Sequence, residues 1–301
     1  QARELRDIMK AYFEGGQQAM NPALATVRNL SNAGLLGNVA SAATQIGDSL
    51  ATVYHQSLVP TLQAVGEKLI GKERITPKQM GLINHVAEEL SDMGRTGRVV
   101  QTALKYSGFQ AIDMFAKGLN LNAALIKATG MAQTLSGQAK LRAKYQAAFG
   151  SEMDLFLGDL RSRRVTDRVE QFLFNELSDA QPISRVEMPE LYLKHPNGRI
   201  LYQMKTYMLK QTDIVRRDAY QNIASGEPKR ILEGTKNLAA LATVYALSNI
   251  PGDLIKDWIS GRPGEDLLST PKLVENVLKT FGLNRYVTEK LEKGKVVETA
   301  Q

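Results

Sequence analysis

The chain has 301 residues, 43% hydrophobic and 23% charged, a balance that excludes wholesale disorder and, with only 6% aromatic residues, favours helix-on-helix packing over a β-sandwich. Because the chain contains no cysteine, disulfides, thiolate metal sites and cysteine nucleophiles are excluded together. The formal net charge of +7 favours polyanionic partners such as nucleic acid or an anionic lipid surface, although a basic surface can equally serve solubility alone.

The N-terminal region begins QARELRDIMK, without an initiator Met or a signal-peptide pattern, so we expect a piece of a longer polypeptide. Gln1–Glu14 is predicted as a short amphipathic helix, and Asn21-Pro22 has the pattern of an N-cap followed by Pro at the first helical position. From there apolar residues recur at steps of three and four, which predicts one helical face, bent near Gly34 or Gly37. The residues of this predicted packing face are Leu24, Val27, Leu30, Leu35, Val39, Ile46, Leu50 and Val53.

The same segment is unusually poor in charge. Between Arg28 and Glu67 the only formal charge is Asp48, and many positions carry Asn, Ser, Thr, Gln, Ala or Gly. A solvent-exposed helix normally carries charged side chains on its outer face. We therefore expect other helices or other subunits to cover this segment, with its small residues allowing close approach.

The middle of the chain is also predicted to be helical. Thr76-Pro77 starts a helix that runs to about Met93, and a helix-rich stretch follows from Thr96 to Phe149. Breaks in that stretch are predicted near its glycines, which are Gly108, Gly118, Gly130 and Gly137. A pair of amphipathic helices then covers Ser151–Ser178. Basic residues cluster at the junction of this pair, namely Arg161, Arg163, Arg164 and Arg168.

A Pro-rich segment, residues 181–198, is predicted to be a linker or a wrapping loop. The predicted domains are therefore 1–180, which holds the charge-poor packing helices, and 199–292, a C-terminal helical region, followed by a frayed tail at 293–301. The helices predicted in the second region are 199–224, 229–249, 253–259, 270–281 and 284–292. No stretch alternates at period two long enough for a sheet, so the expected fold is an all-α multi-helix bundle, compact or elongated.

Motifs for catalysis and cofactor binding are present only in part, because each lacks a residue that the chemistry requires. The segment 66–73 has the spacing of a phosphate-binding loop, but Glu73 stands where Ser or Thr must ligate magnesium. The stretch HVAEE at 85–89 resembles an inverted zinc motif whose second His is Glu, and its carboxylates fit a solvated helix face better than a hydrolase. We therefore predict no catalytic, cofactor-binding or metal-binding residues and no cofactor. We expect this segment not to be an enzyme, although a longer parent chain can carry enzymatic domains.

Two further properties concern partners. The most apolar window, Leu238–Ile250, covers about 20 Å as a helix, short of a ~30 Å hydrocarbon core, and Pro251 is predicted to end it. It is interpreted as a buried core helix, with an interfacial or conditionally inserted helix as the alternative.

Acidic residues interleave with the basic residues of the chain, so ion pairs explain the basic residues as readily as phosphate contacts do. The candidate polyanion contacts are Arg161, Arg163, Arg164, Arg168, Lys205, Lys210, Arg216 and Arg217.

Two blocks of sequence resemble a known group of proteins. The first is NLSNAGLLGNVASAATQIGDSLATVYHQSLVPTLQAVG at 29–66. The second is ELSDAQPISRVEMPELYLKHPNGRILYQMKTYMLKQTDIVRRDAY at 176–220, followed by a Gly-Glu-Pro turn and an Ala/Leu-rich helix that ends in GDLIKDWISGR. Together, from about Asn29 to Arg262, they resemble a helical C-terminal module of bacteriophage large polyvalent proteins, a group that includes internal virion (ejection) proteins of short-tailed phages.

The resemblance implies a non-catalytic structural module that oligomerises near the portal and helps genome delivery through the cell envelope. The implied locations are the virion interior and, after ejection, the host cell envelope. The implied partners are further copies of the chain, portal or core virion proteins, nonspecific double-stranded DNA, and membrane in transient contact. The alternatives left open are a nonspecific DNA-binding or packaging module and an unrecognised cell-wall hydrolase domain.

Overall fold

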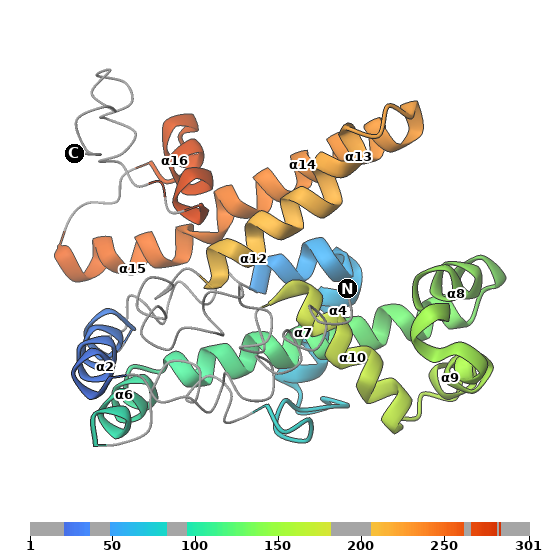
Figure 1. Cartoon of the computed structure of the whole chain (residues 1–301), viewed down its shortest axis with the longest axis horizontal. Helices are drawn as coiled ribbons and strands as arrows, with labels where there is room; N and C mark the ends of the chain where they lie inside the picture. Colours follow the sequence, from blue (N-terminus) through green and yellow to red (C-terminus); the bar gives the residue numbers. More distant parts are fainter. Residues whose placement is uncertain are drawn as a thin grey trace. The chain divides into compact units, whose positions relative to one another are not determined.

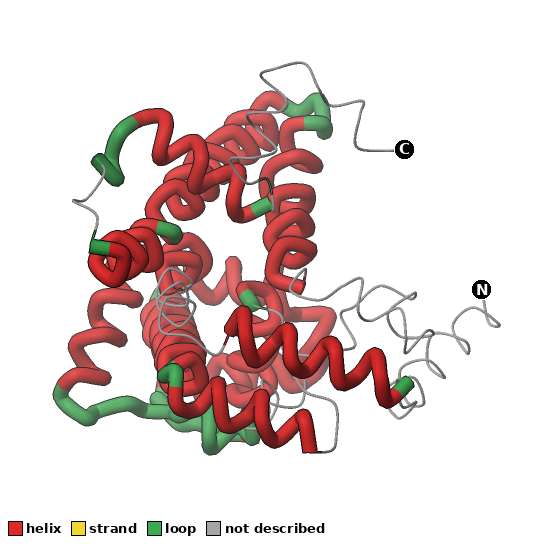
Figure 2. Tube along the Cα trace, turned by 90° about the vertical axis from the view of Figure 1, so that its left-hand side faces the viewer, coloured by secondary structure: helices red, strands yellow, loops and turns green. Residues whose placement is uncertain are grey.

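The computed structural model of the chain describes residues 21–36, 49–82, 95–181, 206–261, 266–281 and 283. Within these ranges helices are joined by turns and short loops, and no residue lies in a strand (Figure 2). The all-α prediction is therefore confirmed for the described part of the chain. The helices predicted at 1–14 and 284–292, the linker beyond residue 181 and the C-terminal tail lie outside the described residues.

The chain divides into two units, each of which is described by itself. The first unit comprises Gln1–Arg28, Val39–Leu50 and Met188–Gln301, and the second comprises Asn29–Asn38 and Ala51–Glu187. This division differs from the predicted domains, because it groups two N-terminal segments with the C-terminal helices.

The second unit is organised around one long helix, α7 (Phe109–Ala132), which is buried along much of its length (Figure 1). The helices in contact with α7 are α4 (Leu58–Leu69), α6 (Arg95–Tyr106), α8 (Leu135–Phe149), α9 (Met153–Arg161) and α10 (Asp167–Ala180). Buried leucines and aromatic rings of α7 to α10 form the core, in which the rings of Phe149 and Phe156 stack with centroids 4.3 Å apart. Each large apolar side chain buried in this way contributes roughly 1.5–3 kcal/mol relative to exposure.

A polar anchor fixes the segment after α4 to α7. The buried Asn122 accepts a hydrogen bond from the backbone N–H of Arg74 at 3.0 Å and donates one to the carbonyl oxygen of Ile75 at 2.8 Å. At Gly118 an added Cβ would come within 3.4 Å of three side chains of α4 and that segment. The break predicted at Gly118 is therefore wrong, because this glycine lies inside α7 and permits a close approach. Gly108, with φ +79°, does separate α6 from α7 as predicted.

The helix predicted from Thr76 onward is absent from its described part. Thr76 and Gln79 exchange the reciprocal hydrogen bonds of a capping box, so the start signal is real. After one turn, however, Gly81 adopts φ +71° and the N–H of Leu82 donates to the carbonyl oxygen of Pro77 at 3.0 Å. These features close the turn as a helix C-terminus. Residues 77–82 are therefore a turn, and residues 83–94 lie outside the described part.

The C-terminal helices of the first unit form a hairpin followed by two shorter helices. The helical run 206–223 contains α12 (Thr206–Ile214), a π-helix (Val215–Tyr220) and α13 (Gln221–Ile223). It turns at Gly226, with φ +75°, into α14 (Pro228–Ser248), which is followed by α15 (Ile250–Ser260) and α16 (Thr270–Thr280). The helices predicted at 229–249 and 270–281 are confirmed as α14 and α16.

The hairpin is held together where α14 contacts the π-helix (Figure 1). The side-chain amide of Asn237 donates to the carbonyl oxygen of Asp218 at 2.9 Å, and Asn222 donates to the same oxygen. A Cβ at Gly234 would lie 2.7 Å from the carbonyl oxygen of Ala219, so only glycine lets α14 lie this close. The sequence pattern predicts a regular helix over 199–224, and the wider π-turn departs from it.

Candidate assembly surface and ligand cavity

The outward face of α4 is apolar. Leu58, Val59, Leu62, Leu69 and Ile70 are each more than half exposed. With 3.6 residues per turn, these positions fall within a sector of about 120° around the helix, and Gly66 lies inside the same sector. None of the six residues carries a charge. We call these five side chains together with Gly66 the α4 stripe.

The other faces of α4 are occupied within the chain. Thr61 and Ala64 are buried, and Ala64 packs with Leu119 and Ala123 of α7. The charged residues of α4 pair with the segment that follows it: Lys68 bonds to Glu73, and Glu67 lies 3.3 Å from Arg74. The α4 stripe is therefore the apolar side of this helix that the described part of the chain leaves exposed.

The packing face predicted from periodicity does not coincide with the side that the chain buries. Val27 and Leu30 of α2 (Pro22–Leu36) are more than half exposed, whereas Arg28 and Asn29 between them are buried. The members that are partly exposed are Leu24, Leu50 and Val53. The members whose side chains lie outside the described part are Leu35, Val39 and Ile46. Periodicity found apolar faces here but could not tell which face the chain itself encloses.

The arginine cluster between α9 and α10 is partly neutralised by Asp159. This buried carboxylate accepts hydrogen bonds from Thr166 and from Arg168, each at 2.9 Å, and Arg164 lies 3.9 Å away. Burial alone would raise the pKa of Asp159. The hydrogen bonds from Thr166 and Arg168 and the charges of Arg168 and Arg164 outweigh burial and lower the pKa below its usual value.

The remaining candidate polyanion contacts divide into paired and unpaired residues. Arg161 and Arg163 form no ion pair with any described residue, so these two are the arginines of the cluster available to an anion. Lys205 lies outside the described residues. In the first unit, Lys210, Arg216 and Arg217 each have a partner. Arg216 bonds to Asp213 at 2.7 Å, and Arg217 bonds to Asp218 at 2.8 Å.

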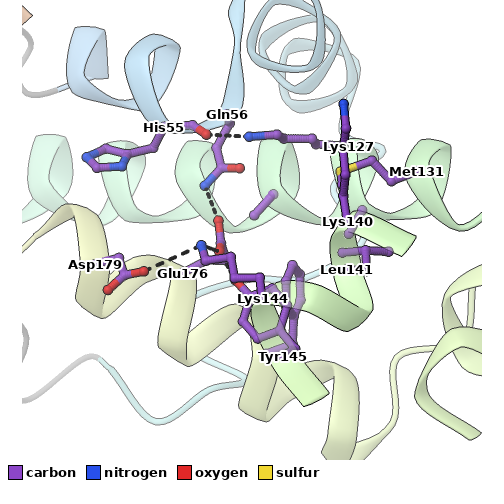
Figure 3. A pocket seen from close by; sticks show the side chains of 13 residues that line it. His55, Gln56, Lys127, Met131, Lys140, Leu141, Lys144, Tyr145, Glu176 and Asp179 are labelled. Atoms are coloured by element: carbon purple, nitrogen blue, oxygen red, sulfur yellow. Dashed lines mark hydrogen bonds and ion pairs between the residues drawn. The ribbon is translucent and has the colours of Figure 1, made fainter. Parts of the chain in front are cut away.

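A cavity in the second unit is lined by three lysines, none of which belongs to a site predicted from the sequence (Figure 3). It lies between the end of the helix at 49–56 and helices α7, α8 and α10. Its volume is about 110 Å³, several times the ~10–15 Å³ that a single water molecule requires. The main polar residues of its wall are His55, Gln56, Lys127, Lys140, Lys144, Glu176 and Asp179.

Glu176 is the buried acid of this cavity, and both of its oxygens are bonded. Its Oε2 accepts from the amide nitrogen of Gln56 at 2.9 Å, and its Oε1 accepts from Lys144 and from the hydroxyl of Tyr145. This fixes the Gln56 amide, because the reverse orientation would set its oxygen against the carboxylate. The amide oxygen of Gln56 consequently has no partner, although Gln56 is only 1% exposed.

Lys127 supports the cavity from α7. Its Nζ donates to the backbone carbonyl oxygen of His55 at 2.6 Å, at a helix end where carbonyl groups lack partners and the dipole favours a cation. Burial lowers the pKa of Lys127, although the negative charge of Glu176 opposes part of this shift. In the sequence, Lys127 is the only formal charge between Lys117 and Lys140, which is the signal that could have marked it.

The segments weighed as phosphate and metal sites give no ligand site in the described residues. Gly66 lies within α4, and Gly71, with φ +69°, follows its end, so the segment 66–73 is a helix terminus and not a phosphate loop. The stretch HVAEE at 85–89 lies outside the described residues. Within the described ranges, no three His, Asp or Glu side chains gather closely enough to hold a metal ion.

The apolar window at 238–250 is longer than predicted. One helical run of the described residues, Pro228–Ile255, is long and apolar enough to cross a membrane by length and composition, and 33% of its most apolar window is buried. This run contains two helices: α14 ends at Ser248, and Pro251 lies in the first turn of α15, where no N–H donor is required. One such helix is weak evidence for a membrane span, since core helices of soluble proteins meet the same criteria.

No family model, curated protein or solved structure matches the chain. The arrangement of its residues is therefore interpreted from their own chemistry.

Proposed function

We propose that this chain is a non-catalytic structural module that assembles with further copies of itself through the α4 stripe. The observation that carries the proposal is the stripe: five large apolar side chains, each more than half exposed, on a helix whose opposite face packs against α7. Clustered apolar side chains left exposed on a protein surface are typical of interaction sites.

A second copy of the chain is the partner that fits the stripe best. The stripe carries no charge, so two stripes can face each other across a two-fold axis without like-charge repulsion. Gly66 at its centre lets two helix axes approach closely, because interaxial distance depends on the side chains at the contact. A Cβ at Gly66 would meet nothing within 4 Å in this chain, so packing inside the chain does not account for the glycine.

The setting we propose is a bacteriophage internal virion (ejection) protein that assembles with portal or core proteins and helps genome delivery through the cell envelope. This part of the proposal rests on the resemblance of the blocks at 29–66 and 176–220. The first block includes most of α4, so the resemblance and the exposed stripe concern the same helix. A module that self-associates suits a protein that must build a conduit.

Native mass spectrometry and analytical ultracentrifugation of the full chain test the assembly. We expect a concentration-dependent oligomer, and we expect Leu62→Lys to weaken association at least about tenfold, because two ammonium groups would meet across the contact. Leu135→Lys is the matched control, since Leu135 is an exposed leucine of α8 in the same unit and lies outside the stripe.

Both variants change exposed residues, so their helix content and melting temperature should stay at wild-type values. A chain that remains monomeric at high concentration would contradict the proposal. Equal oligomerisation of Leu62→Lys and Leu135→Lys would also contradict it.

Nonspecific contact with double-stranded DNA is a second candidate function, favoured by the unpaired Arg161 and Arg163. Contacts to the phosphate backbone weaken steeply with salt, so duplex binding by these residues should largely disappear by ~200 mM salt. The double variant Arg161→Ala/Arg163→Ala should bind duplex DNA more weakly than wild type in a fluorescence anisotropy titration at low salt. Unchanged binding would remove these two arginines from consideration.

A further inference from the structure

We infer that the cavity beside Lys127 and Lys140 is a binding site for a small oxyanion that carries a hydroxyl hydrogen, with hydrogen phosphate as its simplest member. The inference does not depend on assembly through the α4 stripe. It combines three observations: the charge of the cavity wall, an unpartnered acceptor in that wall, and the available volume.

The cavity wall has an excess of positive charge. Lys144 is committed to the two carboxylates of the wall, bonding to Glu176 and lying 3.5 Å from Asp179. Lys127 and Lys140 form no ion pair with any described residue, and the three lysines of the wall outnumber its two carboxylates, so one net positive charge remains. Lys127 is partly buried, and a cation removed from water favours the arrival of an anion. The wall therefore selects a ligand with negative charge.

The amide oxygen of Gln56 adds a second requirement. Figure 3 shows Gln56 and Lys127 next to each other on one side of the cavity, opposite Tyr145. Glu176 holds the amide nitrogen of Gln56, which leaves the amide oxygen as an acceptor without a donor among the described residues. This oxygen is fully buried, so a ligand reaches it only if the Gln56 side chain shifts toward the cavity. A ligand that fills this part of the wall should therefore bring a hydrogen as well as negative charge.

Hydrogen phosphate meets both requirements. At neutral pH it keeps at least one P–OH hydrogen, which can be donated to Gln56, and its other oxygens can accept from Lys127 and Lys140. Its five heavy atoms suit a cavity of about 110 Å³. Sulfate has the same shape and charge density but no hydrogen at neutral pH. The comparison of the two anions thus isolates the contribution of the Gln56 oxygen.

Isothermal titration calorimetry of the full chain with inorganic phosphate, at constant ionic strength, tests the inference. We expect saturable binding, and we expect Lys140→Ala to weaken it about tenfold, because one charge-assisted hydrogen bond is lost. Lys105→Ala is the matched control: Lys105 is an exposed lysine of α6, away from the cavity wall and without an ion pair to a described residue. This control should bind phosphate as wild type does.

Two analogues complete the experiment. Sulfate should bind at least about tenfold more weakly than phosphate, because a site built around a hydrogen-bonding hydroxyl rejects a ligand that lacks it. An alkyl phosphate, which is mostly dianionic at neutral pH since its second pKa is about 6, should behave like sulfate.

The inference is overturned by equal affinity for phosphate and sulfate, or by equal effects of Lys140→Ala and Lys105→Ala. Absence of saturable phosphate binding also overturns it. The stripe variant Leu62→Lys leaves the cavity wall unchanged and should retain wild-type phosphate affinity. Failure of assembly and failure of phosphate binding can therefore be told apart.

Discussion

Two residues other than glycine have a positive φ in the described part of the chain, Ser57 at 72° and Arg163 at 56°. Arg163 follows the end of α9, where its own N–H donates to Leu160 and the N–H of Arg164 donates to the carbonyl oxygen of Asp159. This is the hydrogen-bonding pattern of a helix C-terminus that normally uses glycine. An L-residue in the left-handed region costs about 1–2 kcal/mol, so the backbone at Arg163 is strained.

Arg163→Gly should therefore stabilise the second unit. We expect the free energy of unfolding to rise by about 0.5–1 kcal/mol, because relief of backbone strain exceeds the extra entropy that glycine gives the unfolded chain. Urea denaturation followed by circular dichroism measures the change. Arg161→Gly is the control, since Arg161 is helical and glycine there should destabilise the chain. A less stable Arg163→Gly variant would show that interactions of the arginine side chain stabilise the chain by more than the left-handed backbone destabilises it.

At this scale the sequence revealed residue clusters but not their partners. Four arginines within eight positions mark the junction of α9 and α10 on inspection, but only the fold shows that Asp159 binds Thr166 and Arg168. Lys127 stood out only as a lone charge, because the carbonyl group that it binds lies 72 positions earlier in the chain.

Among the helices, α14 illustrates how a local signal and a tertiary contact combine. Its sequence predicts a helix over 229–249, and the helix is present, although Gly234 lowers helix propensity in its first half. The reason for the glycine is the contact with the π-helix, where a Cβ would lie 2.7 Å from a backbone carbonyl oxygen.

Gly234→Ala should accordingly destabilise the first unit although alanine is the better helix former. We expect a loss of about 1–3 kcal/mol, because the clash involves backbone that cannot rotate away. Gly158→Ala in α9 is the control: a Cβ there meets nothing within 4 Å, so this change should stabilise by about 0.5–1 kcal/mol. Thermal unfolding of both variants measures the difference. If the two alanines change the melting temperature in the same direction, the close approach at Gly234 is not limiting.

Helix ends and buried faces were the least predictable features. The capping box at Thr76 is visible in the sequence, but the turn closes after a few residues because Gly81 adopts a positive φ. Along 22–56 the apolar period was visible, while the enclosed side is lined by polar residues such as Asn29 and Gln56. Most buried polar groups have hydrogen-bond partners, and the partner of the Gln56 amide nitrogen, Glu176, lies 120 positions later in the chain.

For the whole molecule, composition and periodicity were sufficient to predict the all-α class. They could not predict the division into units, because the first unit joins segments that are far apart in the sequence. The only tryptophan of the chain, Trp258, belongs to this unit and is 83% exposed on α15, where Leu254 one turn earlier is also exposed. Trp258 is thus a natural reporter for any surface that covers this helix.

Transient membrane contact predicts a spectroscopic change at Trp258. Beyond Lys236, α14 carries no formal charge, and Leu238 is exposed on it. We expect the Trp258 emission to shift to shorter wavelength when anionic vesicles are added, because indole rings favour the membrane–water interface. Neutral vesicles should produce a smaller shift, since the chain is basic. Unchanged emission with both kinds of vesicle would argue that this face does not meet lipid.

Ser57 links the two surfaces of the second unit. It lies between the helix that brings His55 and Gln56 to the cavity and the helix that carries the α4 stripe, and its φ of 72° and ψ of 158° are almost confined to glycine elsewhere. The angle between these helices is therefore held by the surrounding contacts against the preference of Ser57 itself. A ligand in the cavity and a neighbour on the stripe that favour the same angle would strengthen each other's binding by an equal factor. Thermodynamic reciprocity requires that equality whatever the path of communication.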